Sequence, residues 1–166
     1  MMLELHRVSI GQQIGGLSLM AAQQRPAFLT GPANSGKSAV IRAVMGFIPI
    51  DDGHISIDGE LLTPRSAPYF RKQMAYVPQH LSIPDGYEGL GAWTTMSTDE
   101  RYLLLLRRAI ESRKPLLIVD EAPFALSTET RATVLRLLND AVSSGVTLLC
   151  AHREPTATEL RVESAF

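Results

Sequence analysis

The amino-acid sequence predicts an α/β protein with a mostly parallel central sheet, covered by helices on both faces, and a small antiparallel part at the N-terminus. Short, wholly apolar segments such as residues 115–119 alternate with amphipathic helical segments, a pattern typical of parallel strands joined by helices. The first thirty residues instead alternate weakly and are interrupted by Gly11 and Gly15-Gly16, which favours short antiparallel strands. The length of 166 residues favours one domain, residues 1–166, large enough to bury a core of its own.

The composition narrows the class of protein. Hydrophobic residues make up 45% and charged residues 20% of the chain, as in ordinary soluble globular proteins. The net charge of −1 and the lack of a lysine or arginine cluster argue against nucleic acid as a partner. Cys150 is the only cysteine, so an internal disulfide is excluded and a reducing compartment fits. The N-terminus lacks a secretion-signal run and no stretch could span a bilayer, so a function at a membrane would require another chain to supply the spanning part.

In the N-terminal half, weak alternation predicts strands over residues 3–10 and 15–20. The apolar run 26–30 is followed by glycine and predicts a buried strand, and residues 37–47 then read as a helix. In residues 52–59, isoleucine occupies alternate positions of a short segment that lies between two Asp-Gly pairs. The first pair separates this segment from the apolar residues 47–50. This arrangement predicts an exposed antiparallel hairpin.

The middle of the chain contains one strand, a loop and a helix. Residues 74–77 form a short apolar strand that a proline stops. Residues 81–95 contain one proline and three glycines, so a loop is predicted there. A helix begins at Ser97 and runs to Arg108 or beyond. Ser97 and Glu100 form a capping box, in which each side chain accepts a hydrogen bond from an otherwise unpaired backbone N–H.

The C-terminal part contains two strands with a helix between them. Residues 115–119 form a continuous apolar strand that ends in two acidic residues, and residues 146–151 form a last buried strand that ends at His152. Residues 128–143 have the spacing of an amphipathic helix. The apolar stripe of this helix is predicted to consist of Val134, Leu135, Leu138, Ala141 and Val142.

A glycine-rich loop lies between the buried strand 26–30 and the helix 37–47. Its sequence, Gly31-Pro32-Ala33-Asn34-Ser35-Gly36-Lys37-Ser38, matches the phosphate loop of nucleotide-binding proteins. The glycines let backbone N–H groups turn toward phosphate oxygens, the lysine reaches the β- and γ-phosphates, and the serine hydroxyl can ligate Mg²⁺. The following helix presents its positive end to the same anion.

This context predicts a P-loop NTPase fold that binds a nucleoside triphosphate with Mg²⁺, although a chance glycine-rich turn is the alternative. The predicted nucleotide-binding residues of the loop and helix are Gly31, Pro32, Ala33, Asn34, Ser35, Gly36, Lys37, Ser38 and Ala39.

Four polar side chains follow predicted strands and extend this site. Asp120 ends a buried strand beside the phosphate loop, where a carboxylate can hold Mg²⁺ through water. Glu121 is then placed to polarise the attacking water as a general base. Gln79 offers its amide oxygen to Mg²⁺ and its nitrogen to that water, and His152 can donate to the γ-phosphate while holding Glu121. The alternatives are a solvated strand end for the acidic pair, a polar loop residue for Gln79 and a backbone-bonded histidine for His152.

From about residue 1 to residue 160 the chain resembles the ATP-binding-cassette ATPases, the nucleotide-binding subunits of ABC transporters. Besides the phosphate loop, the segments that carry the resemblance are Asp52-Gly53-His54-Ile55-Ser56-Ile57-Asp58-Gly59, Tyr76-Val77-Pro78-Gln79, Met96-Ser97-Thr98-Asp99-Glu100, Leu116 to Glu121, and His152. The resemblance implies that these are, in the same order, the hairpin after the first helix, the Q-loop, the signature segment, the Walker B strand with its catalytic glutamate, and the switch histidine.

The signature segment departs from the family pattern. The resemblance implies that Ser97 of one subunit caps the γ-phosphate bound by another, assisted by glycine N–H groups. Thr98 and Asp99 replace the two glycines, and Asp99 and Glu100 bring negative charge to a helix end that should receive an anion. ATP sandwiching at Ser97 is therefore expected to be weak or to need a partner with an intact signature. The capping box offers the alternative that these residues only stabilise the helix, by roughly 1 kcal/mol.

The helical subdomain expected of the family is largely missing. Only 18 positions separate Gln79 from Ser97, which is too few to hold it. Residues 80–95, with Tyr87 and Trp93, would then have to dock a permease in its place. The alternative is a short surface loop with one aromatic anchor.

Three single positions also differ from the family. Asn34 stands where glycine is common, and asparagine tolerates left-handed backbone. Ser127 replaces the aspartate expected of the D-loop, which puts communication between two sites in doubt. No Phe, Tyr or Trp precedes Phe28, so the ring that the family usually stacks on adenine is missing. His6 and Arg7 are the candidates to replace that ring, and loose base selectivity is expected.

The resemblance implies an ATP-binding and ATP-hydrolysing subunit that energises a separate membrane permease. Lys37 and Mg²⁺ would stabilise the charge that develops during phosphoryl transfer to water, and Glu121 would position the water. The implied partners are a permease and a second cassette ATPase, in a homodimer or heterodimer. The implied location is cytoplasmic, at the inner face of the cell membrane. The alternative is a nucleotide-dependent regulatory or assembly subunit with little turnover, which the altered signature favours, whereas the neutral charge disfavours an ATPase acting on nucleic acid.

Overall fold

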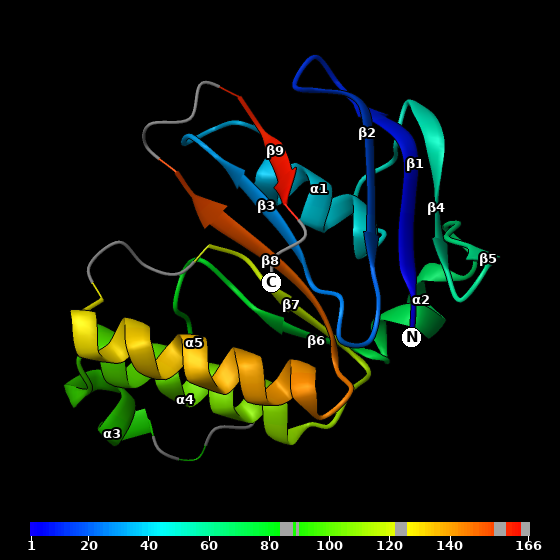
Figure 1. Cartoon of the computed structure of the whole chain (residues 1–166). Coiled ribbons are helices and arrows are strands. Elements are labelled where there is room, and N and C mark those ends of the chain that lie inside the picture. The colour runs from blue at the N-terminus through cyan, green and yellow to red at the C-terminus, as the bar shows by residue number, and fades with distance from the viewer. Residues whose placement is uncertain (84–87, 89, 122–125, 155–158, 164–166) are drawn as a thin grey trace.

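The computed structural model describes residues 1–83, 88, 90–121, 126–154 and 159–163. Its strands are β1 (Leu3–Ile10), β2 (Ile14–Ala21), β3 (Ala27–Gly31), β4 (Asp52–Ile57), β5 (Glu60–Leu61), β6 (Met74–Val77), β7 (Leu116–Val119), β8 (Thr147–Arg153) and β9 (Arg161–Glu163). Its helices are α1 (Lys37–Val44), α2 (Ala67–Arg71), α3 (Leu90–Thr95), α4 (Thr98–Glu111) and α5 (Thr128–Ser143). Figure 1 shows the two sheets that these strands form, and the predicted α/β class is confirmed.

The central sheet has the strand order β6-β7-β8-β3-β9. The first four of these strands are parallel, and β9 runs antiparallel to β3, with Leu29 opposite Val162. The carboxyl ends of parallel strands meet at one edge of a sheet. The phosphate loop after β3, Gln79 after β6 and Asp120 after β7 therefore leave the sheet at the same edge, which is where ligands bind in open α/β sheets.

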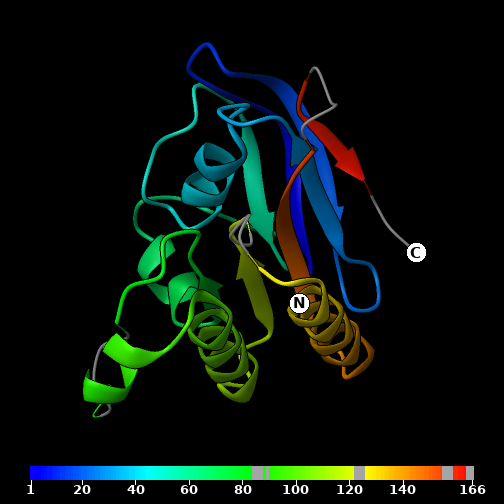
Figure 2. The same cartoon turned by 90° about the vertical axis from the view of Figure 1, so that its left-hand side faces the viewer.

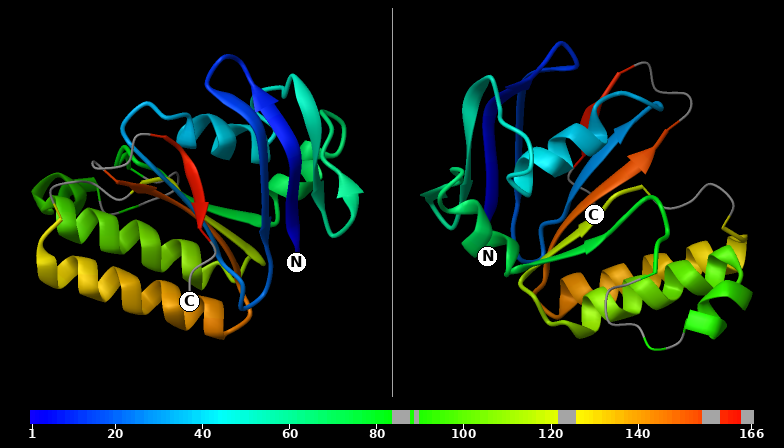
Figure 3. Two further views of the ribbon diagram at one scale, coloured as in Figure 1. Left: turned by 45° about the horizontal axis from the view of Figure 1, so that its top comes forward. Right: turned by 180° about the vertical axis from the view of Figure 1, so that it is seen from behind.

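Alternate side chains of the buried strands serve two separate cores. Leu116 and Leu149 belong to a core shared with α1 and the N-terminal sheet, whereas Leu117 and Leu148 belong to a core under α4 and α5. Helices α4 and α5 lie side by side over one face of the central sheet (Figures 1 and 2), and α1 lies between the two sheets (Figure 3). Both faces are covered, which explains why these strands are apolar throughout.

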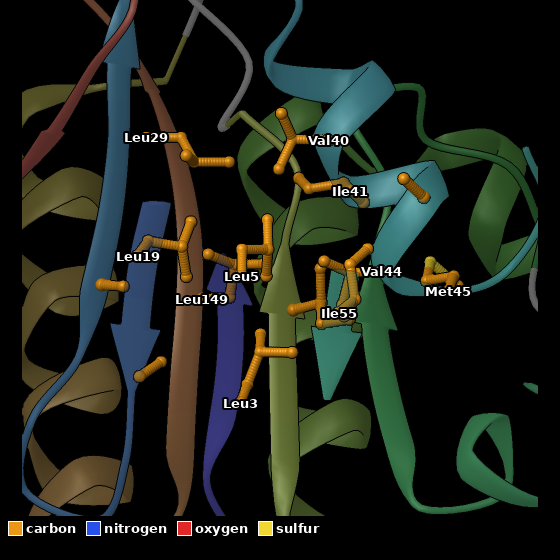
Figure 4. Close-up of a cluster of buried hydrophobic side chains, with 14 of the residues drawn as sticks. Leu3, Leu5, Leu19, Leu29, Val40, Ile41, Val44, Met45, Ile55 and Leu149 are labelled. Atoms are coloured by element: carbon orange, nitrogen blue, oxygen red, sulfur yellow. The ribbon is translucent and has the colours of Figure 1, made fainter. Parts of the chain in front are cut away.

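The N-terminal sheet is antiparallel, with the order β2-β1-β4-β5. The predicted hairpin of β4 and β5 is present, but its expected exposure and its start are wrong. Asp52 and Gly53 belong to β4, and Ile55 and Ile57 are buried because β4 pairs along β1 and packs against α1. Figure 4 shows Ile55 in this core beside Val44 of the helix.

Several predicted boundaries also differ. Helix α1 ends at Val44 rather than at residue 47, because the chain turns at Gly46 and the N–H of Phe47 bonds back to the carbonyl of Arg42. The span predicted for α5 is confirmed, but Leu135 is 60% exposed and does not belong to the apolar stripe. The buried residues Val134, Leu138, Ala141 and Val142 follow helical spacing, and Leu135 lies about 100° around the axis from Val134.

The segment between Gln79 and Ser97 contains α3 in its described part, where a loop was predicted. Trp93 of α3 is only 4% exposed. The Nε of Arg101 donates to the Trp93 carbonyl at 3.0 Å, and the central carbon of the guanidinium lies 5.5 Å from the centroid of the Trp93 ring. Trp93 is thus an anchor between α3 and α4 and is not available for docking. Tyr87 lies outside the described residues. No helix in the described parts of the chain combines the length and the apolar composition that a membrane crossing requires.

Candidate nucleotide-binding site

The phosphate loop joins β3 to α1 in the conformation that its residue types favour. Asn34 has φ 61° and Gly36 has φ 93°, so the left-handed backbone expected at Asn34 is present. A Cβ atom on Gly36 would lie 2.6 Å from Cδ1 of Ile14, and one on Gly31 would lie 2.7 Å from Oγ of Ser35. Glycine is required at position 36 by the left-handed backbone, and Ile14 of β2 packs directly against the loop.

Lys37 lies at the centre of the loop and is only 4% exposed. Its Nζ donates to the carbonyl oxygens of Gly31 at 3.0 Å and Pro32 at 2.6 Å, and it lies 3.4 Å from Oγ of Ser35. The same Nζ lies 3.6 Å from Oε2 of Glu121. A buried ammonium needs such partners, and the pair brings the predicted catalytic carboxylate to the phosphate loop.

Asp120 is held by two hydroxyl groups, and it is only 5% exposed. The Ser38 hydroxyl donates to Oδ1 at 3.0 Å, and the Tyr76 hydroxyl donates to Oδ2 at 3.3 Å. Burial, and then the neighbouring Asp120 charge, raise the pKa of Tyr76 to about 12, so the phenol remains protonated and able to donate. Tyr76 belongs to the segment that resembles the Q-loop, but its contact with Asp120 was not predicted from the sequence.

Glu121 follows Asp120 with an unusual backbone. It is buried, and its φ of 36° is costly for a residue with a side chain. Such strain gathers at functional sites, where the surrounding structure enforces it. The observation fits a role for Glu121 beyond ending a strand.

A cavity of about 310 Å³ opens over the phosphate loop. The loop residues from Ala33 to Ala39 line it together with Gln79 and Glu121. The structure thus brings together most of the predicted site. Three further lining residues were not predicted from the sequence, and these are Gln13, Arg42 and Arg153.

His152 is not among the residues that line this cavity. It is exposed on β8, opposite Thr30 of β3. Neighbouring residues of a strand point to opposite faces. Ala151 faces the core that contains α1, and Arg153 lies on the same side as Ala151. Because side chains alternate along the strand, Arg153 faces the cavity and His152 does not. This alternation could have been inferred from the sequence.

The predicted base-contacting residues also lie elsewhere. His6 stacks on His54 of β4, with ring centroids 5.1 Å apart, and neither His6 nor Arg7 lines the cavity. Gln13, in the turn between β1 and β2, lines it instead. The side chain that lines this side of the cavity is therefore the amide of Gln13.

The start of α4 is satisfied within the chain, and Ser97 is not among the cavity-lining residues. The predicted capping box is confirmed: the Glu100 N–H donates to Oγ of Ser97 at 3.2 Å, and the Ser97 N–H donates to Oε2 of Glu100 at 2.7 Å. Asp99 accepts hydrogen bonds from Ser127 at the start of α5. Contacts with the hydroxyls of Ser127 and Thr130 hold the pKa of Asp99 below its usual value, and the Ser97 N–H does the same for the pKa of Glu100.

The oxygen atoms at Ser38 and Asp120 are suitable for Mg²⁺. In the described residues there is no group of three or more acidic, histidine or cysteine side chains that could hold a metal alone. Mg²⁺ at nucleotide sites typically takes one or two protein oxygens and completes its shell with phosphate and water. A hydroxyl and a carboxylate 3.0 Å apart beside a phosphate loop fit that donor set.

Fold and loop together define the chain as a P-loop nucleotide-binding domain. The family model described as ABC transporter matches residues 14–91. The chain is 28% identical to an Fe(3+) ions import ATP-binding protein, FbpC 2, of Pectobacterium atrosepticum, over 94% of this chain and 57% of that protein. It is 27% identical to an ATP-dependent lipid A-core flippase of Cupriavidus metallidurans, over 84% of this chain and 31% of that protein. The chain therefore spans between about a third and somewhat over half of the length of these relatives.

Solved structures share the fold. The ATP-binding subunit of an ABC transporter superposes with a TM-score of 0.75 at 18% identity, covering 92% of this chain and 80% of that chain. A bacterial Atm1-family ABC exporter solved with ATP bound gives a TM-score of 0.71 at 22% identity, covering 90% of this chain and 34% of that chain. The comparisons support the resemblance to ATP-binding-cassette ATPases, and the solved structures show that the chain shares the fold of their ATP-binding domains.

Proposed function

We propose that the chain binds Mg²⁺-ATP at the phosphate loop and hydrolyses it, as the energising subunit of an ABC transporter whose permease is a separate protein. The observation that carries the proposal is the group of the buried residues Lys37, Asp120 and Glu121 at the carboxyl ends of two parallel strands, with Ser38 hydrogen-bonded to Asp120. Residues 1–166 act as one domain in this proposal.

Each side chain has a defined task. Backbone N–H groups of the loop and the Nζ of Lys37 neutralise the β- and γ-phosphates. Ser38 and Asp120 hold Mg²⁺, which when bound supplies positive charge to the phosphate oxygens. Glu121 accepts a proton from water as the water oxygen bonds to the γ-phosphorus and the bond to the bridging oxygen breaks. Gln79 orients that water from the cavity wall, and His152, at the end of β8, is the proposed donor to the γ-phosphate.

The partners follow from the same proposal. The relatives include the ATP-binding protein of an iron importer and a flippase, so the family supports a membrane permease as partner without selecting import or export. A second cassette ATPase completes the catalytic site, and the protein works at the inner face of the cell membrane through the permease. Because Asp99 and Glu100 occupy the start of α4, a heterologous second subunit supports catalysis better than a second copy.

A regulatory or assembly subunit with little turnover is the second candidate. The observation that favours it is the start of α4, where Ser97 and Glu100 form a capping box and Asp99 bonds to Ser127, so that carboxylates occupy the helix end that would receive a phosphate. Steady-state ATP hydrolysis by the wild type and by Glu121→Gln separates the two functions, with nucleotide binding measured in parallel. Hydrolysis that falls by orders of magnitude in Glu121→Gln supports the ATPase. Binding with equal background-level rates supports the regulatory subunit, and no binding by the wild type contradicts both.

A further inference from the structure

Tyr76 has a place in the site that was not predicted from the sequence. Its phenol donates to Oδ2 of Asp120 at 3.3 Å, while the Ser38 hydroxyl donates to Oδ1 at 3.0 Å. Each oxygen of the carboxylate is thus fixed by one hydroxyl group. The carboxylate is 5% exposed, so the two hydroxyls replace much of the hydration that a free carboxylate would have.

The backbone makes this contact a fixed one. Tyr76 lies opposite Ile118 in the parallel pairing of β6 with β7, and the Asp120 N–H continues the ladder by donating to the Val77 carbonyl at 2.9 Å. Ile118 and Asp120 are two residues apart, so they share a face of the sheet. That face is the one covered by α1, from which Ser38 projects.

The direction of this hydrogen bond suits a positioning role. The Tyr76 hydroxyl donates and the Asp120 carboxylate accepts. A hydroxyl group carries no positive charge, so it can hold a carboxylate without competing with a cation for it.

We propose that Tyr76 is a positioning residue for Mg²⁺-nucleotide binding, which holds Oδ2 of Asp120 so that Oδ1 is presented to Ser38 and the phosphate loop. The proposal rests on the proposed function, because it assigns Tyr76 to the same site. Residues that orient a metal-binding carboxylate from behind often contribute tenfold or more to metal affinity.

The test is Tyr76→Phe, which removes the hydroxyl and keeps the ring. The control is Tyr69→Phe on α2, because Tyr69 is 63% exposed and outside the site. A fluorescent ATP analogue is titrated at increasing Mg²⁺ and also in EDTA. Tyr76→Phe is expected to raise the Mg²⁺ concentration at half-maximal binding about tenfold, and to leave binding in EDTA unchanged. Tyr69→Phe is expected to match the wild type.

The outcomes separate this inference from the proposed function. If the wild type binds the analogue with no Mg²⁺ dependence, the Mg²⁺ site itself is wrong. If the wild type depends on Mg²⁺ and Tyr76→Phe has the same midpoint, the positioning role is overturned. A lower melting temperature with an unchanged midpoint has the same meaning, since it shows a structural role only.

A double-mutant cycle with Asp120→Asn gives a second measurement. If Tyr76 acts through Asp120, adding Tyr76→Phe to Asp120→Asn should change the Mg²⁺ midpoint by less than about twofold. A full tenfold additional change would show that Tyr76 acts through another group and would overturn the proposal.

Discussion

Asp99 at the start of α4 accepts two hydrogen bonds from Ser127 at the start of α5, one from the hydroxyl at 2.6 Å and one from the backbone N–H at 3.2 Å. Both positions depart from the cassette pattern: Asp99 stands where a signature glycine is expected, and Ser127 where the D-loop aspartate is expected. The two substitutions thus contact each other. The contact joins the starts of α4 and α5 within one chain. It places a carboxylate where the family pattern has backbone N–H groups of glycine.

Asp99→Asn should reduce stability at neutral pH more than at acidic pH. The Ser127 and Thr130 contacts lower the pKa of Asp99 in the folded protein, so the folded state binds the proton less readily than the unfolded state, whose value is about 3.9. The stabilisation is therefore present above that value and is lost as pH falls through the folded-state pKa. Urea unfolding at pH 7 and pH 3 measures the difference between wild type and variant, with Asp140→Asn on the exposed side of α5 as control. A gap that does not shrink at pH 3 contradicts this assignment.

The Glu121→Gln protein should not form tight homodimers with ATP. In a symmetric dimer, Asp99 and Glu100 would face the γ-phosphate bound by the other copy, and like charges repel. Analytical ultracentrifugation with and without Mg²⁺-ATP measures the association. Adding Thr98→Gly and Asp99→Gly to Glu121→Gln removes one charge and two side chains, so association should increase. ATP-dependent dimers of the single Glu121→Gln variant at micromolar concentration would refute the prediction.

Tyr102→Phe should leave stability unchanged or increase it. Tyr102 is fully buried in the core under α4 and α5, and its hydroxyl has no hydrogen-bond partner among the described residues. Burial also raises the pKa of this tyrosine, which keeps it neutral. A buried hydroxyl without a partner costs about 1–3 kcal/mol, and phenylalanine keeps the ring packing. Equilibrium denaturation measures the change, and a loss of more than about 1 kcal/mol would reveal a bound water or another partner.

Nucleotide affinity should depend weakly on the base. Gln13 forms the cavity wall on the side of the β1–β2 turn, where an amide can bond to many bases but offers no ring for stacking. ATP and GTP should bind within a few-fold of each other. Gln13→Tyr should tighten ATP binding about fivefold, since a ring contact contributes roughly 1 kcal/mol. Competition titrations measure both effects, with Gln12→Tyr as the matched control. A strong ATP preference in the wild type would point to a different base-binding wall.

Features set by local chemistry were predictable from the sequence. The phosphate loop, the capping box of Ser97 and Glu100, and the span of α5 all follow from spacing over a few residues, and the structure has them. The short helix α2 was missed because five residues are too few to show a period. Leu135 was wrongly assigned to the buried stripe because it is apolar and directly follows Val134, which does belong to the stripe.

Contacts between distant segments could not be predicted in the same way. Asp99 and Ser127 are 28 residues apart, and Tyr76 and Asp120 are 44 apart, so only the packing of α4 on α5 and of β6 on β7 brings them together. Arg153 is an intermediate case. The alternation of side chains along β8 could have placed Arg153 on the cavity side. His152 was predicted instead, because the apolar run of the strand ends at that residue.

The contact between Ile14 and Gly36 links two parts of the molecule that the chain keeps separate. The first residue of β2 closes off the rear of the phosphate loop, and β2 pairs with β1, which pairs with β4 over α1. The N-terminal sheet thus packs against the phosphate loop through Ile14 and limits how far the loop can move toward β2. A change of loop shape on taking up phosphate must displace the turn that carries Gln13, or be resisted by it. Phosphate binding at the loop and the position of Gln13 in the cavity wall are therefore coupled through the packing of Ile14 and Gln13 beside Gly36.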